Sequence, residues 1–385
     1  MTPSIDRDYI TRTLADLVRI NSVNPALEPG GPAEREIAAY VADALAALGC
    51  KVATHEPEPG RVSVVGRLGG ARGRSLMLNA HMDTVGVAGM AEPFSGAVRE
   101  GKLYGRGAYD MKGSLAACLG AVKGLADAKA KLAGAVLIAA VADEEHASLG
   151  TADLLRHYRP DAAIVTEPTA LEICLAHKGF AWIDIETAGR AAHGSRPDLG
   201  VDANLAMGRV LGSLAPLARA LRGRAPHPLV GTPSLHAGVL AGGTAPSVYA
   251  AQAKVTIERR TVPGETDEQV MGEIEEILAR LRRDDSAFTA RATLGLSRPP
   301  FEISRDAEIV QTLGRAYHAA LGRAPSFGGQ TPWMDSALLA EAGVETVVFG
   351  PGGAGAHAAE EWVDLESVFA VAEVLAETAV EYLAR

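Results

Sequence analysis

The first part of the chain alternates between segments with helical periodicity and short apolar runs. Apolar residues recur at helical spacing in residues 6–20, 32–48, 114–126 and 150–158. An apolar run of strand length lies at residues 76–80, interrupted only by Asn79. The continuous apolar runs at residues 135–142 and 162–165 are typical of strands that are buried in a sheet. Strands that alternate with helices in this way predict an α/β fold, with a mostly parallel sheet and helices on both of its faces.

Residues 179–294 show a different pattern. Residues 180–187 alternate between apolar and polar side chains, which is typical of a strand with one exposed face. Further elements are predicted as strands at residues 234–240, 247–260 and 288–294, and as helices at residues 201–221 and 265–281. We interpret this segment as an α+β domain in which helices cover one face of a sheet.

The length of the chain favours two domains, because 385 residues exceed the size at which a single hydrophobic core usually stops growing. Chain-breaking residues flank the α+β segment, at His177-Lys178-Gly179 and at residues 295–300. We therefore predict one domain built from residues 1–178 and 295–385, with residues 179–294 inserted into it as a second domain.

Charge and cysteine content narrow the class of protein. A net charge of −10 argues against nucleic acid or a membrane as partner and favours small molecules or peptides. Cys50, Cys118 and Cys174 lie far apart and predict neither a disulfide framework nor a thiolate zinc site. The N-terminus lacks a signal-peptide pattern, and no apolar run reaches the ~18 residues of a membrane span. We expect a cytoplasmic protein.

Polar residues follow each of the three apolar runs. His81 and Asp83 come after the first run, Asp143-Glu144-Glu145 after the second, and Glu167 after the third. Because sites in such sheets lie at the carboxyl ends of the strands, we expect these side chains to lie close together. Clustered carboxylates repel one another unless cations balance their charge. For Glu144, Glu145 or Glu167 taken singly, the alternative is an ordinary surface turn.

His81 and Asp83 are two positions apart, so their side chains point to the same side of the strand end. His81 can then bind a metal through one ring nitrogen while Asp83 holds the other. Asp110 adds a carboxylate in a glycine-rich loop, just before the helix predicted at residues 114–126. On this segment alone, a structural pair of His81 and Asp83 without a metal is an equally good interpretation.

The chain combines five motifs, namely His81-x-Asp83, Gly105-x-Gly-x-x-Asp110-Met-Lys-Gly, Asp143-Glu-Glu145, Glu167-Pro and Phe349-Gly-Pro-Gly…His357. In this order they resemble the two-zinc deacylases and carboxypeptidases, a family that includes acetylornithine deacetylase, succinyl-diaminopimelate desuccinylase, aminoacylase and glutamate carboxypeptidase. The resemblance spans nearly the entire chain. It implies a zinc-exopeptidase-like catalytic domain at residues 1–178 and 295–385, and a lid and dimerisation domain at residues 179–294.

The resemblance implies a centre with two divalent metal ions. His81, Asp110 and Glu167 would hold one ion, and Asp110, Glu145 and His357 the other, with Asp110 shared between them. Ligands of this kind, without thiolate, suit zinc, which we expect first, and also cobalt or manganese. The family also has a cis peptide bond after the aspartate that corresponds to Asp110.

The resemblance also assigns catalytic roles to residues that bind no metal. Glu144 would be the general base beside a metal-bridged hydroxide, and Asp83 would support the centre. His193 would reach the active site of a partner subunit and stabilise the oxyanion, and Arg260 would bind the carboxylate of the substrate. Without the family, His193 is better interpreted as a surface histidine and Arg260 as a member of an ion pair.

These roles predict a metal-dependent amidohydrolase that removes the acyl group from the nitrogen of an amino acid and works as a homodimer. A carboxypeptidase acting on dipeptides or acyl-glutamate compounds would use the same chemistry. The alternative outside the enzymes is a non-catalytic metal-binding protein. The presence of Glu144 argues against it, because a protein that only binds metal needs no general base. The chain departs from the family at Ser247, where many relatives have asparagine, so the substrate class stays open.

Overall fold

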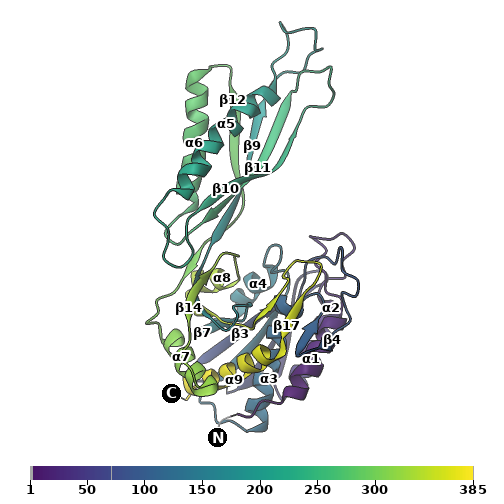
Figure 1. The fold of residues 1–385 in the computed structure, drawn as a ribbon, viewed down its shortest axis with the longest axis vertical. Coiled ribbons are helices and arrows are strands. Elements are labelled where there is room, and N and C mark those ends of the chain that lie inside the picture. The colour runs from purple at the N-terminus through teal and green to yellow at the C-terminus, as the bar shows by residue number, and fades with distance from the viewer. Residues whose placement is uncertain (1–2, 71, 385) are drawn as a thin grey trace. The chain divides into compact units, whose positions relative to one another are not determined.

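The computed structural model describes residues 3–70 and 72–384, and the chain divides into two compact units (Figure 1). The first unit consists of Met1–Leu175, Ile303–Gly328 and Met334–Arg385, and the second of Ala176–Glu302 and Gly329–Trp333. The second unit continues past residue 294 because its last long strand extends to Arg298. The catalytic role of the first unit and the lid and dimerisation role of the second stay predictions.

The main sheet of the first unit follows the order β1-β2-β6-β3-β7-β15-β8. Its strands are β1 (Lys51–Glu58), β2 (Arg61–Gly69), β3 (Ser75–His81), β6 (Ala135–Val141), β7 (Ala162–Val165), β8 (Ile173–His177) and β15 (Glu345–Val348). Two short strands, β13 (Phe301–Glu302) and β14 (Phe327–Gln330), occur where the chain passes between the units. The residues of β3, β6 and β7 are almost all buried, as expected for central strands.

The α/β prediction is confirmed, but the sheet is mixed rather than mostly parallel. Parallel pairing joins β6 to β3, β3 to β7 and β7 to β15. Antiparallel pairing joins β1 to β2, β2 to β6 and β15 to β8. Only Pro59 and Gly60 separate β1 from β2, and so short a connection can join antiparallel strands but not parallel ones.

Two groups of helices pack on this sheet (Figure 1). The first group contains α1 (Arg7–Arg19), α3 (Gly113–Asp127), α7 (Glu308–Leu321) and α9 (Leu365–Tyr382). The second group contains α2 (Arg35–Ala47), α4 (Leu149–His157) and α8 (Ser336–Glu341). Gly120 lets α3 approach α1 closely, since a Cβ atom there would lie 2.4 Å from Cγ1 of Ile10.

A small sheet in the first unit brings two distant segments of the chain together. Its order is β16-β17-β5-β4, with β4 (Ala97–Arg99), β5 (Lys102–Tyr104), β16 (Gly353–Ala354) and β17 (Trp362–Asp364). A short kinked turn, η1 (Ala108–Lys112), in which Asp110 and Met111 depart from helical geometry, follows β5 and leads into α3. Strands of two or three residues are too short to show a periodic pattern, so the sequence did not predict them.

The second unit has a four-stranded antiparallel sheet in the order β10-β11-β9-β12. Its elements are β9 (Gly179–Ala188), α5 (Ala203–Arg222), β10 (Ser234–Gly242), β11 (Gln252–Thr261), α6 (Asp267–Asp284) and β12 (Thr289–Arg298). Ile183 and Val255 of the sheet form a core with Val210 of α5 and Ile274 of α6. The predicted α+β architecture is therefore confirmed, and β10 is left as an edge strand whose residues are exposed from His236 onward.

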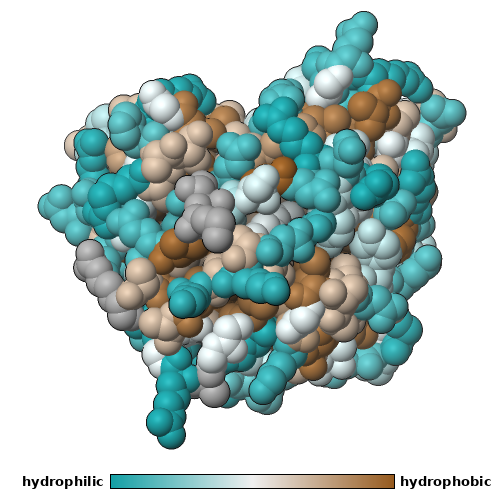
Figure 2. All heavy atoms as spheres, turned by 90° about the horizontal axis from the view of Figure 1, so that it is seen from below, coloured by the Kyte–Doolittle hydropathy of each residue, from teal (hydrophilic) through white to brown (hydrophobic). Residues whose placement is uncertain are grey.

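Among residues 3–70 and 72–384, none of the helices combines the length and the hydrophobicity that crossing a lipid bilayer requires. The face shown in Figure 2 carries hydrophilic side chains with smaller hydrophobic areas between them.

Candidate metal centre

Three neighbouring strands of the first unit bring polar residues to one edge of the sheet. His81 is the last residue of β3, Glu144 and Glu145 follow β6, and Glu167 follows β7. Since β6, β3 and β7 are adjacent and parallel, their carboxyl ends meet at this edge. His81 and Glu167 are buried there, and Glu144 and Glu145 are partly buried.

Asp110 lies between two histidines. Its Oδ1 atom is 3.1 Å from Nε2 of His81, and its Oδ2 atom is 3.4 Å from Nε2 of His357. The same nitrogen of His357 lies 3.0 Å from Oε2 of Glu145, and Nε2 of His81 lies 3.7 Å from Oε1 of Glu167. Asp110 thus presents one oxygen toward His81 and the other toward His357, so this carboxylate could be shared by two ions.

The donor atoms of this site fit divalent metal ions. One ligand atom each from His81, Asp110 and Glu145 lies within 4.8 Å of the others, and the same holds for His81, Glu144 and Glu167. These groups differ from the two predicted sets, since they contain Glu144 and not His357. Oε1 of Glu145 is buried and has no hydrogen-bond partner, which is costly for a carboxylate unless a cation meets it. Imidazole and carboxylate without thiolate suit zinc, cobalt or manganese.

Burial and mutual charge shift the pKa values of this group, as is typical of functional sites. Burial raises the pKa of Glu144 well above its usual value, and the charge of Glu167 adds to the effect. Burial raises the pKa of Glu167 in the same way. For Asp110, burial acts upward, but hydrogen bonds from His357 and His81 bring its pKa below the usual value. Bound cations would lower the pKa of each of these carboxyl groups.

Asp83 makes different contacts from those predicted. Nδ1 of His81 lies 2.9 Å from the backbone oxygen of Asp83 but 3.6 Å from its carboxylate, which is beyond normal hydrogen-bonding distance. The carboxylate instead accepts hydrogen bonds from the backbone N–H groups of Glu144 (3.1 Å) and Glu145 (3.3 Å). It also accepts one from Nδ2 of Asn24 at 2.8 Å. Asp83 therefore orients both glutamates through their main chain.

Glu361 holds the loop that carries Asp110, and the sequence did not predict it. Its carboxylate accepts hydrogen bonds of 2.9–3.1 Å from the backbone N–H groups of three loop residues, Gly107, Tyr109 and Asp110. Arg106 pairs with the same carboxylate at 2.6 Å, and both side chains are buried. The peptide bond between Asp110 and Met111 is cis, as the resemblance implied.

The other two predicted site residues, His193 and Arg260, belong to the second unit. His193 is exposed, with Nδ1 2.8 Å from Oγ of Ser195, and its backbone forms a β-bridge with Val248. Arg260 pairs with Glu258 at 3.1 Å. In the described part of the chain, the groups of potential metal ligands include neither residue.

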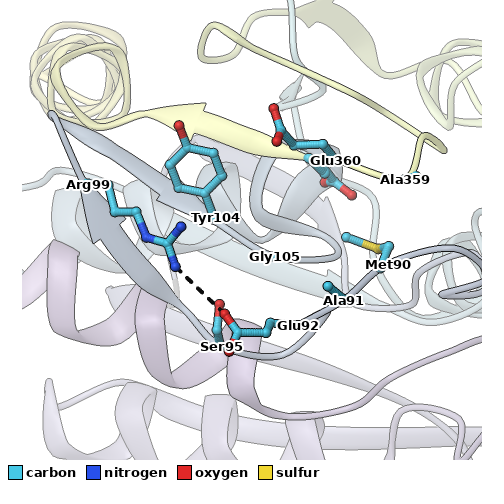
Figure 3. A pocket seen from close by; sticks show the side chains of 10 residues that line it. Met90, Ala91, Glu92, Ser95, Arg99, Tyr104, Gly105, Ala359 and Glu360 are labelled. Carbon is cyan, nitrogen blue, oxygen red and sulfur yellow. Dashed lines mark ion pairs between the residues drawn. The ribbon is translucent and has the colours of Figure 1, made fainter.

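A cavity of about 310 Å³ adjoins the loop before Asp110 (Figure 3). It is lined by Met90, Ala91, Glu92, Ser95, Arg99, Tyr104, Gly105, Ala359, Glu360 and Glu361. Arg99 and Glu92 form an ion pair of 3.6 Å in its wall. None of the five predicted metal ligands is among the described residues that line it.

Residues 77–381 match the family described as Peptidase family M20/M25/M40. An acetylornithine deacetylase from Myxococcus xanthus is 34% identical over 328 residues, which cover 82% of this chain and 82% of that protein. An N-formyl-4-amino-5-aminomethyl-2-methylpyrimidine deformylase from Halalkalibacterium halodurans is 29% identical over 371 residues, covering 88% and 87%. The crystal structure of an M20 family metallo-carboxypeptidase from Sulfolobus solfataricus has the same fold, with a TM-score of 0.79, 18% identity, and coverage of 98% and 99%.

Proposed function

We propose, since the chain belongs to peptidase family M20/M25/M40, that this metal-dependent hydrolase cleaves the amide bond of N-acyl amino acids and releases the free amine. The observation that carries the proposal is the position of Asp110, with one oxygen toward His81 and the other toward His357. An N-acyl amino acid is favoured as substrate because the Myxococcus relative is an acetylornithine deacetylase.

We assign two ions, zinc in the first instance, to the five predicted ligands, His81, Asp110, Glu145, Glu167 and His357. When bound, the ions would supply a water of lowered pKa and would polarise the amide carbonyl. Glu144 would accept a proton from the attacking water and donate it to the leaving nitrogen. Asp83 supports this role. Its carboxylate accepts a hydrogen bond from the backbone N–H of Glu144 and so fixes the position of that residue.

Arg260 is our candidate for binding the carboxylate of the substrate. Arg259 and Arg260 are neighbours on β11, so their side chains point to opposite faces of the sheet. Arg259 is buried and pairs with Glu265 and Glu273, which gives it a structural role. Arg260 is partly exposed and lies over the ring of Phe180, and a guanidinium placed in this way can bind a carboxylate through two parallel hydrogen bonds.

The proposal predicts a metal-dependent release of amine. The protein loaded with zinc, cobalt or manganese should hydrolyse N-acetyl amino acids. A chelator should abolish this activity until the metal is restored. The reason is that bound ions would supply a water of lowered pKa, which the chain cannot supply without them. Amine release is measured over a panel of N-acetyl amino acids, N-formyl amines, dipeptides and acyl-glutamate compounds.

The same panel separates the alternatives. Cleavage of dipeptides or acyl-glutamate compounds without cleavage of N-acetyl amino acids would identify a carboxypeptidase. If the metal-loaded protein hydrolyses none of these amides, the proposed hydrolytic activity is contradicted, and a protein that only binds metal is the remaining alternative.

We also infer that the second unit mediates a homodimer. Its exposed large apolar side chains include Leu199, Val201, Leu205, Val239, Leu240 and Val248. Val239 and Leu240 lie on the edge strand β10, which has unpaired backbone groups that can bond to the same strand of a second copy. His193 is bridged to Val248, so it lies beside this apolar set.

Mixing two inactive variants tests whether His193 acts across the dimer. In a heterodimer of His193→Ala and Glu144→Ala chains, one active site would combine an intact base with an intact partner histidine. Random reassortment should therefore restore about one quarter of the wild-type activity, measured as amine release. Each variant alone is the control. If mixing restores nothing although the subunits exchange, His193 does not act in the partner's site.

A further inference from the structure

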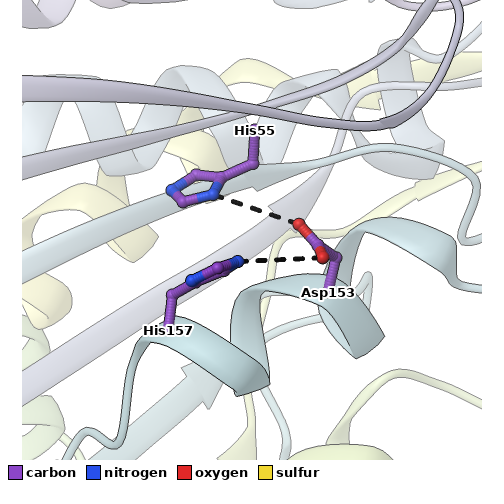
Figure 4. A group of neighbouring side chains, drawn as sticks. All are labelled: His55, Asp153 and His157. Carbon is purple, nitrogen blue, oxygen red and sulfur yellow. Dashed lines mark ion pairs between the residues drawn. The ribbon is translucent and has the colours of Figure 1, made fainter.

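A third cluster of potential metal ligands lies in the first unit and shares no residue with the centre described above (Figure 4). His55 comes from β1, and Asp153 and His157 come from α4. The Oδ2 atom of Asp153 lies 4.0 Å from Nδ1 of His55, and its Oδ1 atom lies 3.8 Å from Nε2 of His157. We propose that these three residues bind a divalent transition-metal ion such as zinc, which ties β1 to α4 and takes no part in hydrolysis.

The local structure explains why the three side chains converge. Asp153 and His157 are four positions apart on α4, so they lie next to each other on one face of the helix. That helix packs against β1, and His55 is one of the less exposed residues of this strand. The two imidazole rings lie with their centroids 4.8 Å apart, and both approach the Asp153 carboxylate (Figure 4).

The distances fit an ion better than direct bonds. At 3.8 and 4.0 Å, the nitrogen and oxygen atoms are too far apart for hydrogen bonds. Two ligands that each lie about 2.0–2.1 Å from a tetrahedral zinc ion are about 3.3 Å from one another. One ligand atom from each residue lies within 4.8 Å of the others, so pairs of ligands would have to close by up to about 1.5 Å to complete a site with three protein ligands and one open position.

Tyr158 supports the orientation that metal binding needs. Its Oη atom lies 3.1 Å from Nε2 of His55, the ring nitrogen that faces away from Asp153. When Nε2 donates its hydrogen to this oxygen, the lone pair of Nδ1 points toward the cluster. Metal-binding histidines usually have such a partner on the second ring nitrogen, because it fixes both the tautomer and the ring orientation.

The charges in the cluster also favour a metal over protons. Burial and the neighbouring His157 lower the pKa of His55 and Asp153 acts in the opposite direction, with the net shift downward. Arg156 is the competing cation, at 3.8 Å from Oδ1 of Asp153, but its side chain is 77% exposed and can turn into solvent. The side chain of His157 is half exposed, which leaves a route for an ion and a water.

The test is equilibrium dialysis of the full chain against buffered free zinc, with the bound metal counted by mass spectrometry. The wild-type chain should bind about one more zinc ion than His157→Ala. Losing a residue that only supports a ligand typically weakens metal binding ~10–100-fold, and the loss of the ligand His157 should weaken it by more than that. Alanine is the best helix former, so the exposed His157 can be replaced with α4 intact. His55→Gln is a second variant from the other element and should give the same loss.

His318→Ala, an exposed histidine of α7, is the matched control and should bind as many ions as wild type. Amide hydrolysis should be unchanged in His157→Ala, which separates this site from the catalytic one. Equal zinc content in wild type and both variants would overturn the proposal. Loss of hydrolysis together with the ion would overturn the claim that this site is independent of catalysis.

Discussion

Replacing Glu144 by alanine should lower kcat for amide hydrolysis by about 10²–10⁴-fold while the metal content stays that of wild type. Glu144 is not one of the five assigned ligands, and its Oε2 atom lies 4.0 Å from Nε2 of His81. A base acts on the water and the leaving nitrogen in the transition state, so the loss should fall on kcat rather than on KM. Steady-state kinetics and metal analysis of the same preparation measure both quantities.

Two further variants make the Glu144 experiment specific. Glu144→Gln keeps the size of the side chain but cannot accept the proton, so it should lose as much activity as the alanine variant. Glu36→Ala, an exposed glutamate of α2, should change neither kcat nor metal content. Normal hydrolysis by Glu144→Ala would refute the assigned base, and a parallel loss of metal would make Glu144 a ligand.

Asp110→Asn should remove metal binding and activity together. One carboxylate oxygen faces His81 and the other faces His357, so a neutral amide weakens both groups of ligands at once. The affinity for metal should fall by more than the ~10–100-fold expected for a residue that only supports a ligand. Metal analysis after dialysis measures the loss, and circular dichroism shows whether the chain is still folded.

Asp127→Asn is the matched control for this substitution. Asp127 is an exposed aspartate at the end of α3, paired only with Lys123 in the ion pairs of the described residues, so metal content and kcat should not change. Retention of both ions with normal affinity in Asp110→Asn would show that this carboxylate is not shared between them.

The sequence predicted those parts of the fold that depend on local patterns. The apolar runs of β3, β6 and β7 are long enough to identify as strands, and their alternation with helices was sufficient to predict an α/β fold. The direction of the outer strands was not predicted, because it depends on how each connection turns rather than on hydrophobic periodicity. β2 and β6 pair antiparallel, for example, although they are separated by β3 and α3 along the chain.

For the candidate site, the residues at strand ends were predictable and those that hold them in place were not. His81 and Glu167 follow apolar runs, so their positions could be derived from the sheet. Asn24 and Glu361 lie in loops without a distinctive pattern, and they reach the site only through tertiary contacts. The contacts of the Asp83 carboxylate also depend on how the loop after β6 turns, which the sequence does not reveal.

The hydrogen bonds between Glu361 and the loop of Asp110 join segments that are synthesised at different times. Gly107 and Glu361 are 254 positions apart. The ribosome therefore synthesises the loop of Asp110 long before it synthesises Glu361, whose carboxylate accepts hydrogen bonds from that loop. His357 is translated equally late. A chain that ends before residue 357 would therefore lack one of the proposed metal ligands and also the carboxylate that accepts hydrogen bonds from the loop of Asp110.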